Sequence, residues 1–319
     1  MAYTIIRPEN RDKWLELRAA GIGSSEVSTI LGYNPFETPY QLWRRKLGLD
    51  PPVEENYAMK RGHFLEDAVA QFYADATGRE IIKRSATDWL IYNNDKPYLR
   101  VSPDRTFWIP DRPKSNSNKG IVECKTTLLE VDKQQLPMHW FSQLIYQLGV
   151  AEMEFGSIAW LSGRMEFDYV DLEFDNEFYE FMVGEVEKFY RDNLIGRQEP
   201  MAMNVDDTIL KFPRHAPGKF LEADTEMEDQ IRRLKTIKEE LAALDADKKS
   251  IEEEIKMAMA DCEAVTAHGS TLARPMILCT WKAAKDSQKF DEKKFAKENP
   301  DMYAQYMMTV PGSRRFLTK

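Results

Sequence analysis

Two short segments carry the residue types that a phosphodiester-cutting site needs. Asp104 closes an apolar, strand-like stretch, and Glu123 and Lys125 follow after residues 105–122. Carboxylate oxygens are the ligands that a hard divalent cation prefers. On an extended strand Glu123 and Lys125 project from one face, where the amine can hold or deprotonate a metal-bound water beside the scissile phosphate. The spacing predicts the site of a metal-dependent nuclease.

The same three residues taken alone also fit an ordinary surface ion pair, because this loose spacing arises by chance in many chains. Their surroundings favour chemistry. Ile121 and Val122 make the Glu-x-Lys strand partly buried, and two charged side chains on one buried face need a reason to be there.

A third carboxylate, Glu66, lies in a helix expected over residues 56–77. It fits two-ion hydrolysis, in which two cations about 4 Å apart stabilise the attacking and leaving oxygens. The competing interpretation is a solvated helix glutamate. His63, one turn earlier on the same face, is either a ligand or a histidine on the helix surface.

Arg18 and Ser25 flank a helix break at Gly21–Gly23. A helix start with free N–H groups and serine hydroxyls attracts anions, and an arginine adds a fork of donors, so these residues predict a phosphate site. Ordinary capping by Ser24 is the alternative.

Gln143 and Gln147 are four residues apart in an expected helix over residues 137–150 and therefore share a face. Their amides could position water or the DNA strand. Buried glutamines bonded to the backbone would give the same pattern, and the sequence leaves both interpretations open.

The elements expected to position these residues alternate between helix and strand. Helices are expected over residues 10–20, 24–31, 38–47, 56–77, 137–150 and 176–194, and strands over 80–83, 88–92, 98–102, 105–109, 120–126, 157–161 and 166–172, with a loop over 111–120. Strands with helices before and after them predict an α/β (α+β) core centred on a mixed β-sheet.

We expect three parts along the chain: a catalytic core over residues 1–200, a linker over 201–217 and an appendage over 218–319. The appendage combines a long helix over 222–260 that has a coiled-coil seam, a β-hairpin from 264–267 and 276–281, and a short helix over 291–298. Its expected role is contact within an oligomer or with a partner.

Composition narrows the class of protein. The 43% hydrophobic and 11% aromatic content suits a packed protein, and no apolar run reaches the roughly 20 residues that cross a bilayer. Three scattered cysteines form no disulfide framework, which predicts a soluble protein of the cytoplasm. The net charge of −9 is unusual for a DNA-binding protein and requires the basic residues to gather in one groove.

The ordered motifs resemble those of lambda exonuclease and the YqaJ-like viral recombinases. The matching segments are Leu17–Val27, Arg61-Gly62 with Leu65-Glu66, Ser102-Pro103-Asp104, Glu123-Cys124-Lys125 and Gln143. The resemblance implies a restriction-endonuclease-like core of the PD-(D/E)xK type and Mg²⁺-dependent digestion of linear duplex DNA from 5′ ends, with Mn²⁺ as a substitute ion. It also implies a homo-oligomer, for which a ring around DNA is one form, a single-strand annealing partner, and a phage or prophage protein acting in a bacterial host.

The resemblance also implies a role for each matching position. Asp104, Glu123 and the Cys124 carbonyl would be the metal ligands, and Lys125 would activate the water. Glu66 and Gln143 would support Lys125, and Arg18 and Ser25 would form the pocket for the 5′-phosphate. The appendage has no counterpart in the minimal family core, and the three scattered cysteines disfavour the iron–sulfur branch. An endonuclease of the same fold and a non-catalytic DNA-end-binding scaffold are the alternatives.

Overall fold

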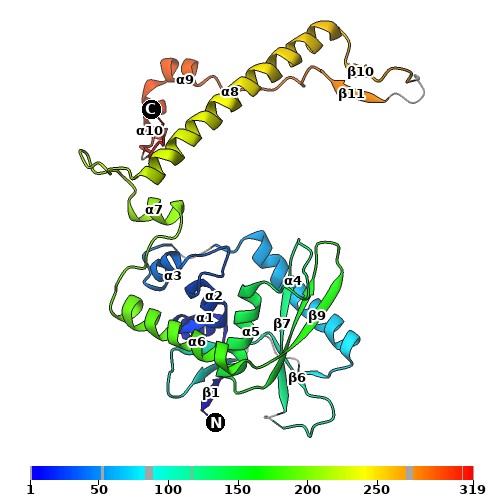
Figure 1. The fold of residues 1–319 in the computed structure, drawn as a ribbon, viewed down its shortest axis with the longest axis vertical. Helices are drawn as coiled ribbons and strands as arrows, with labels where there is room; N and C mark the ends of the chain where they lie inside the picture. The colour runs from blue at the N-terminus through cyan, green and yellow to red at the C-terminus, as the bar shows by residue number, and fades with distance from the viewer. Residues whose placement is uncertain are drawn as a thin grey trace. The chain divides into compact units, whose positions relative to one another are not determined.

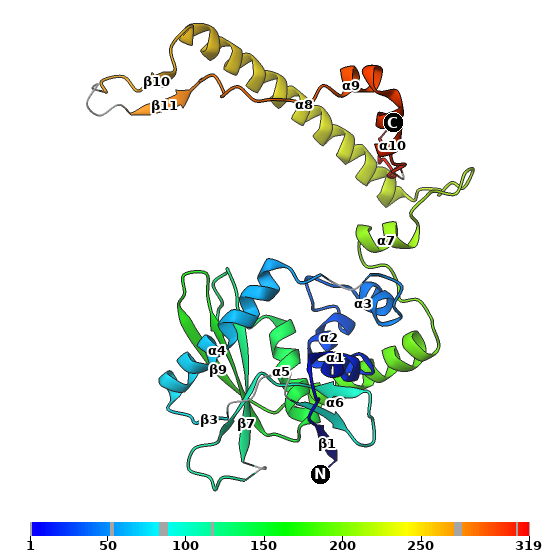
Figure 2. The same cartoon turned by 180° about the vertical axis from the view of Figure 1, so that it is seen from behind.

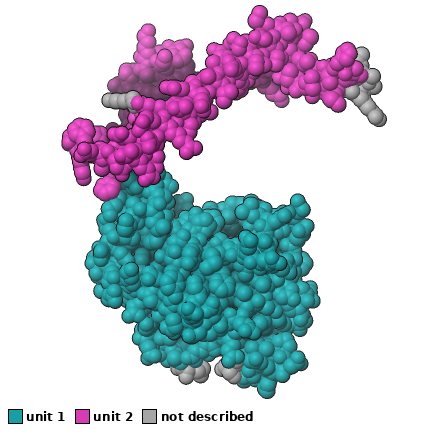
Figure 3. Space-filling model, viewed as in Figure 1, with its two compact units in different colours: residues 1–211 teal, residues 212–319 magenta. Residues whose placement is uncertain are grey.

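The structure, a computed structural model, describes residues 2–51, 54–82, 89–115, 118–270, 276–310 and 312–318. The chain divides into two compact units, Met1–Lys211 and Phe212–Lys319 (Figure 3). All candidate site residues lie in the first unit.

A five-stranded mixed sheet forms the centre of the first unit (Figure 1). Its strand order is β3 (Ile81–Ile82), β6 (Arg105–Trp108), β7 (Lys119–Thr126), β8 (Phe155–Leu161) and β9 (Phe167–Glu173). β7 and β8 run parallel, and the other neighbouring pairs are antiparallel. This arrangement, with helices on both faces, confirms the expected fold class.

The core of this unit is built on both faces of the mixed sheet. On one face α4 (Tyr57–Thr77) packs through Val69 and Tyr73 against Val122. On the other face α5 (Met138–Val150) packs against Ile121, and in both ribbon views α5 lies between the sheet and α2 (Ser24–Ile30) (Figures 1 and 2). Neighbouring residues of β7 therefore face different helices, as the two-residue period of a strand requires.

A second sheet of four strands accompanies the mixed sheet, where the sequence predicted one sheet. Its order is β1 (Tyr3–Ile6), β4 (Leu90–Asn93), β5 (Leu99–Val101) and β2 (Ile22–Gly23). β1 was not expected, because four residues at the start of a chain have too little pattern to indicate a strand that pairs with residues about ninety positions away. The ends of two expected strands, Lys83 and Asp88, lie outside the described residues.

The first unit has further helical elements, several of which begin at polar caps. They are α1 (Arg11–Ala19), α3 (Pro39–Lys46), α6 (Asn176–Lys188), a π-helical turn (Phe189–Ile195) and α7 (Val205–Lys211). The side chains of Asn10, Thr38, Asn56 and Asp175 each accept a hydrogen bond from a backbone N–H in the first turn of α1, α3, α4 and α6. Replacing one such cap with alanine costs about 1 kcal/mol.

The expected linker over residues 201–217 contains α7, and the division between the units falls inside it, after Lys211. Asp207 of α7 is fully buried and accepts hydrogen bonds from the Thr38 hydroxyl at 2.8 Å and the Met203 N–H at 2.9 Å. These bonds attach α7 to the first unit.

The second unit begins with α8 (Thr225–Met259), a helix of 35 residues. The hairpin of β10 (Ala264–Thr266) and β11 (Ile277–Thr280) follows, and then α9 (Glu292–Glu298) and α10 (Pro300–Tyr306). α10 was not expected. Among the described residues of either unit, no helix is both long and apolar enough to cross a membrane.

Candidate active site

The alternation of β7 brings Glu123 and Lys125 to the face that α5 covers. Glu123 is 2% exposed, and its Oε1 lies 2.8 Å from Lys125 Nζ. The Lys125 side chain keeps 19% of its surface exposed, so the pair is enclosed yet reachable. Glu123 and Lys125 lie on the same face of β7, as expected for residues two apart on a strand.

Two glutamines of α5 complete the hydrogen bonding of this pair. Gln143 accepts from Lys125 Nζ at 2.8 Å and donates to Glu123 Oε1 at 2.5 Å. Gln147 is fully buried; its Nε2 lies 2.9 Å from Glu123 Oε2 and 3.2 Å from Ser24 Oγ. The glutamines are therefore bonded to side chains of the site, which decides against the alternative of backbone-bonded amides.

Asp104 meets Glu123 from the neighbouring strand. It precedes β6, and its Oδ2 accepts a hydrogen bond from the Cys124 N–H at 2.9 Å. Burial, followed by the nearby carboxylates of Glu123 and Glu66, raises the pKa of the Asp104 carboxyl well above its usual range. The candidate ligands thus share one site and one concentration of negative charge.

Glu66 reaches the edge of this site from α4, where an arginine that the sequence analysis missed holds it. Arg105 is 6% exposed, ion-pairs with Glu66 Oε1 at 2.5 Å, and also pairs with Asp67. The Arg105 guanidinium also donates to the Asp104 carbonyl oxygen at 2.6 Å. Arg105 directly follows Asp104 in the sequence, and this position was the signal that could have identified it as a residue of the site.

The protonation of Lys125 follows from its carboxylate neighbours. Burial alone would lower the pKa of the Lys125 ammonium, but Glu123 and Asp104 together raise it above the usual value. The lysine is therefore a charged donor in the metal-free protein. Burial also raises the pKa of the Cys124 thiol well above its usual range, with Asp104 adding to the effect, so the thiol is neutral.

Arg18 and Ser25 lie in direct contact. Arg18 Nη2 donates to Ser25 Oγ at 2.8 Å, and its guanidinium stacks over the Trp14 ring. The Trp14 indole donates to Ser102 Oγ at 3.1 Å, which joins α1 to the Ser-Pro-Asp motif. Both predicted phosphate contacts are partly exposed and can meet a ligand.

A buried ion cluster supports this region. Glu26 lies 2.7 Å from Lys46 Nζ and 3.1 Å from Arg45, and accepts the Gly23 N–H at 2.8 Å. Burial alone would raise the pKa of the Glu26 carboxyl, but Lys46, Arg45 and Arg18 lower it overall. The ionised Glu26 thereby fixes the chain between α1 and α2.

Two histidines of the first unit need separate accounts, because one was weighed as a ligand and the other was missed. His63 lies on the surface of α4 and pairs with Glu55 at 2.8 Å, so it is not part of the carboxylate group. His139 was missed, although it precedes Gln143 by the same four residues that separate Gln143 from Gln147. Burial and the Lys125 ammonium lower the pKa of His139, which leaves this ring neutral near the lysine.

Residues 13–154 match the family model of the YqaJ-like viral recombinase domain. This range contains every candidate residue from Arg18 to Gln147. This segment of the chain is therefore similar to the YqaJ-like viral recombinase domain. Consistent with this, the chain is 27% identical over 306 residues to the uncharacterized protein YqaJ of Bacillus subtilis strain 168, which covers 92% of this chain and 90% of that protein.

Solved exonuclease structures are more distant from this chain. The alkaline exonuclease LHK-Exo from Laribacter hongkongensis is 17% identical, with a TM-score of 0.44 over 63% of this chain and 96% of that one. A phage related exonuclease from Haemophilus somnus 129PT is 13% identical, with a TM-score of 0.37 over 56% of this chain and 96% of that one.

The carboxylates of Asp104 and Glu123 have the chemistry that suits a hard divalent cation. Among the described residues no three His, Cys, Asp or Glu side chains form a ready metal cluster. Mg²⁺, however, is commonly held by one or two carboxylates and keeps several waters. Burial, and after it the Glu123 carboxylate, raise the pKa of Asp104, and a cation between Asp104 and Glu123 would offset the repulsion between these two carboxylates.

Proposed function

We propose that this protein is a metal-dependent exonuclease that degrades linear duplex DNA in the 5′-to-3′ direction. One observation carries the proposal: Asp104, Glu123 and Lys125 share a site, and Gln147 connects Glu123 to Ser24, the residue next to the Arg18–Ser25 pair. The candidate cleavage site and the candidate phosphate site are thereby linked through one side chain. The recombinase family match supports DNA as the substrate.

Mg²⁺, or Mn²⁺ in its place, would be held by Asp104 and Glu123 with the Cys124 carbonyl, and would polarise the scissile phosphate and lower the pKa of a coordinated water. Lys125 donates to oxygens of the phosphate or the attacking water, and Gln143 fixes the direction of its ammonium. A two-ion mechanism would need Glu66 as a further ligand, which requires its ion pair with Arg105 to open.

The direction of digestion is proposed to follow from the Arg18–Ser25 pair. A guanidinium and a hydroxyl 2.8 Å apart can each donate to the oxygens of a terminal phosphate. Holding that phosphate fixes which phosphodiester bond reaches the carboxylates, which is catalysis by positioning. The annealing partner and the ring implied by family resemblance remain predictions.

The proposal is tested by incubating the purified protein with linear, nicked and covalently closed circular duplex DNA, in Mg²⁺ and in EDTA. We expect nucleotide release from linear DNA in Mg²⁺ alone. Cutting of closed circles would instead support an endonuclease of the same fold. DNA-end binding without nucleotide release in either Mg²⁺ or Mn²⁺ would support the scaffold alternative and contradict the proposal.

A further inference from the structure

The long helix α8 exposes a row of apolar side chains. Ile237, Leu241 and Leu244 are 41%, 55% and 64% exposed, and Ile251 and Ile255 continue the row at 58% and 42%. Most stability of a helix in a protein comes from packing its apolar face, and a contiguous exposed apolar surface marks an interaction site. The row therefore indicates a surface that another helix covers.

The row follows a heptad repeat, written abcdefg. Position a is taken by Met227, Leu234, Leu241, Lys248 and Ile255, and position d by Gln230, Ile237, Leu244, Ile251 and Ala258. Alternating spacings of three and four are those of a coiled-coil seam, and a single lysine at position a restricts register and the number of helices. The pattern favours a pair of helices.

The charges beside the seam disfavour a parallel self-pair. In that arrangement each g residue meets the e residue of the next heptad in the other helix. Arg233 would face Lys238, Glu240 would face Asp245, and Asp247 would face Glu252, so that each of these three pairs has like charge. Like charges across a coiled coil oppose association.

An antiparallel self-pair has a more favourable balance of charge, because Arg233 lies beside Glu254 and Lys238 beside Asp245, against one repulsive pair of Glu240 beside Asp247. Residues 231–238 carry four basic side chains and no acidic one, whereas residues 245–254 carry five acidic side chains and two lysines. Reversing one helix brings the basic half of each copy against the acidic half of the other. With Leu241 facing Leu244 of the second copy, Leu234 faces Ile251 of the second copy. Ile237 and Ile255 then face the long side chains of Lys248 and Gln230.

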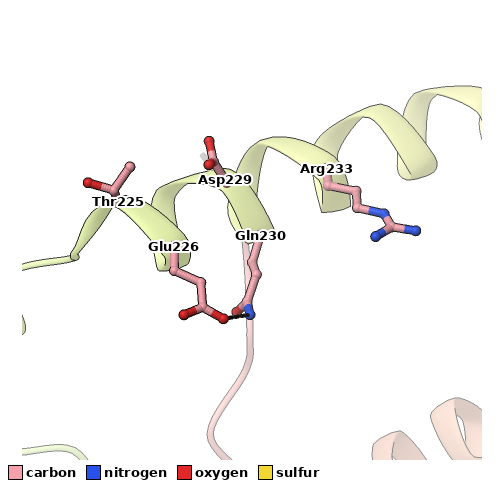
Figure 4. A pocket seen from close by; sticks show the side chains of 5 residues that line it. All are labelled: Thr225, Glu226, Asp229, Gln230 and Arg233. Carbon is pink, nitrogen blue, oxygen red and sulfur yellow. Dashed lines mark hydrogen bonds between the residues drawn. The ribbon is translucent and has the colours of Figure 1, made fainter.

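The same register pairs two side chains that lack ion pairs in the single chain. Arg233 would lie beside Glu254 of the second copy, and neither has an ion-pair partner within the described part of the chain. Figure 4 shows Arg233 extending along the side of α8 that also carries Glu226 and Gln230, over a hollow of about 480 Å³. This hollow flanks the seam and leaves space for a side chain of a facing helix.

We propose that α8 pairs with α8 of a second copy of this chain in an antiparallel two-helix coiled coil. The pairing involves only the second unit, so the proposal does not depend on nuclease activity. It assigns the appendage a self-associating role.

Disulfide cross-linking of the full-length chain tests whether a second copy of α8 covers the seam and whether the two helices run antiparallel. Cys262 and Cys279 are first replaced by serine, and Leu234→Cys and Ile251→Cys are then made separately in that background. These two positions are about 25 Å apart along one helix. We expect a disulfide-linked dimer when the two proteins are mixed and oxidised, and none above the background protein when either is oxidised alone. A dimer from Leu234→Cys alone would show parallel pairing and overturn the proposal.

Solution mass supplies the second measurement, by light scattering over a concentration series. Leu244→Asp, in the seam, should raise the dissociation constant at least tenfold. Ala243→Asp places the same charge off the seam and should leave it unchanged. The proposal would be overturned if Leu244→Asp and the unaltered chain had equal masses at every concentration and no mixed cross-link formed. That result would also be expected if α8 bound a different protein.

Charge reversal checks the register. Arg233→Glu should raise the dissociation constant about tenfold, because it creates two repulsive pairs in the symmetric dimer. Adding Glu254→Arg to the same chain should restore association, since the two side chains would again have opposite charge. A double variant as weak as the single one would contradict this register.

Discussion

Gln147 Nε2 lies 2.9 Å from Glu123 Oε2, and the same nitrogen lies 3.2 Å from Ser24 Oγ. One buried amide therefore contacts both the candidate catalytic carboxylate and the first residue of α2, whose next residue, Ser25, receives the Arg18 hydrogen bond. Gln147 Oε1 has no hydrogen-bond partner among the described residues, so within this part of the chain the amide is held through its nitrogen. This geometry makes Gln147 a positioning residue between the two sites.

Gln147→Leu should lower nucleotide release about tenfold, because loss of a hydrogen bond to a charged group costs on the order of 1.5–3 kcal/mol. The substitution should also reduce the preference for 5′-phosphorylated ends, since it disconnects Glu123 from α2. Release rates on 5′-phosphate and 5′-hydroxyl substrates measure both effects. Gln71→Leu, on the exposed face of α4, is the matched control. Unchanged rates and preference in Gln147→Leu would remove this residue from the site.

Glu123→Gln and Lys125→Ala should each reduce nucleotide release by at least about 100-fold, as expected for loss of a group that assists proton transfer or ligates the ion. Binding to DNA ends should persist, because neither change removes the Arg18–Ser25 pair. Gel-shift and release assays in the same buffer separate the two quantities.

The control for this pair is Lys119→Ala, which removes a lysine from the other end of β7. Circular dichroism must show that each variant is folded. Full activity in both site variants would contradict their assignment.

Asp104→Asn should stabilise the metal-free protein at neutral and alkaline pH. Because the pKa of Asp104 is raised in the folded state, the folded protein holds this proton more tightly than the unfolded chain. Its contribution to stability is complete below the usual aspartate pKa and is lost as the pH rises through the raised value, with a slope of at most about 1.4 kcal/mol per pH unit. The asparagine variant avoids this loss.

Urea unfolding in EDTA across a pH series measures the effect. The gain of Asp104→Asn over the unaltered protein should be largest at high pH and vanish in acid, whereas Asp95→Asn, on the exposed surface, should show no such trend. A gain that grew toward acid would reverse the sign of the argument.

The sequence predicted the parts of this site that follow from local periodicity. Glu123 and Lys125 share a face because a strand alternates, and Gln143 and Gln147 share a face because a helix repeats near four residues. Contacts between distant segments were not predictable in this way. Arg105 with Glu66, and Gln147 with Ser24, depend on how α4, α5 and α2 pack, which no local pattern encodes. The second sheet was missed for the same reason.

Arg18→Ala should narrow the difference in degradation rate between 5′-phosphorylated and 5′-hydroxyl linear duplexes, with the phosphorylated substrate losing more. The guanidinium is charged and donates to Ser25 Oγ, so its removal takes away a donor and the positive charge that would meet the phosphate. Arg11→Ala, at the exposed start of the same helix, removes an equal charge at a distance from Ser25 and should leave the ratio unchanged. The initial rates on the two substrates, measured at subsaturating DNA, give the ratio directly. Equal rates on both substrates for the unaltered protein would exclude a phosphate pocket at Arg18 and Ser25, while nucleotide release itself would still identify a nuclease.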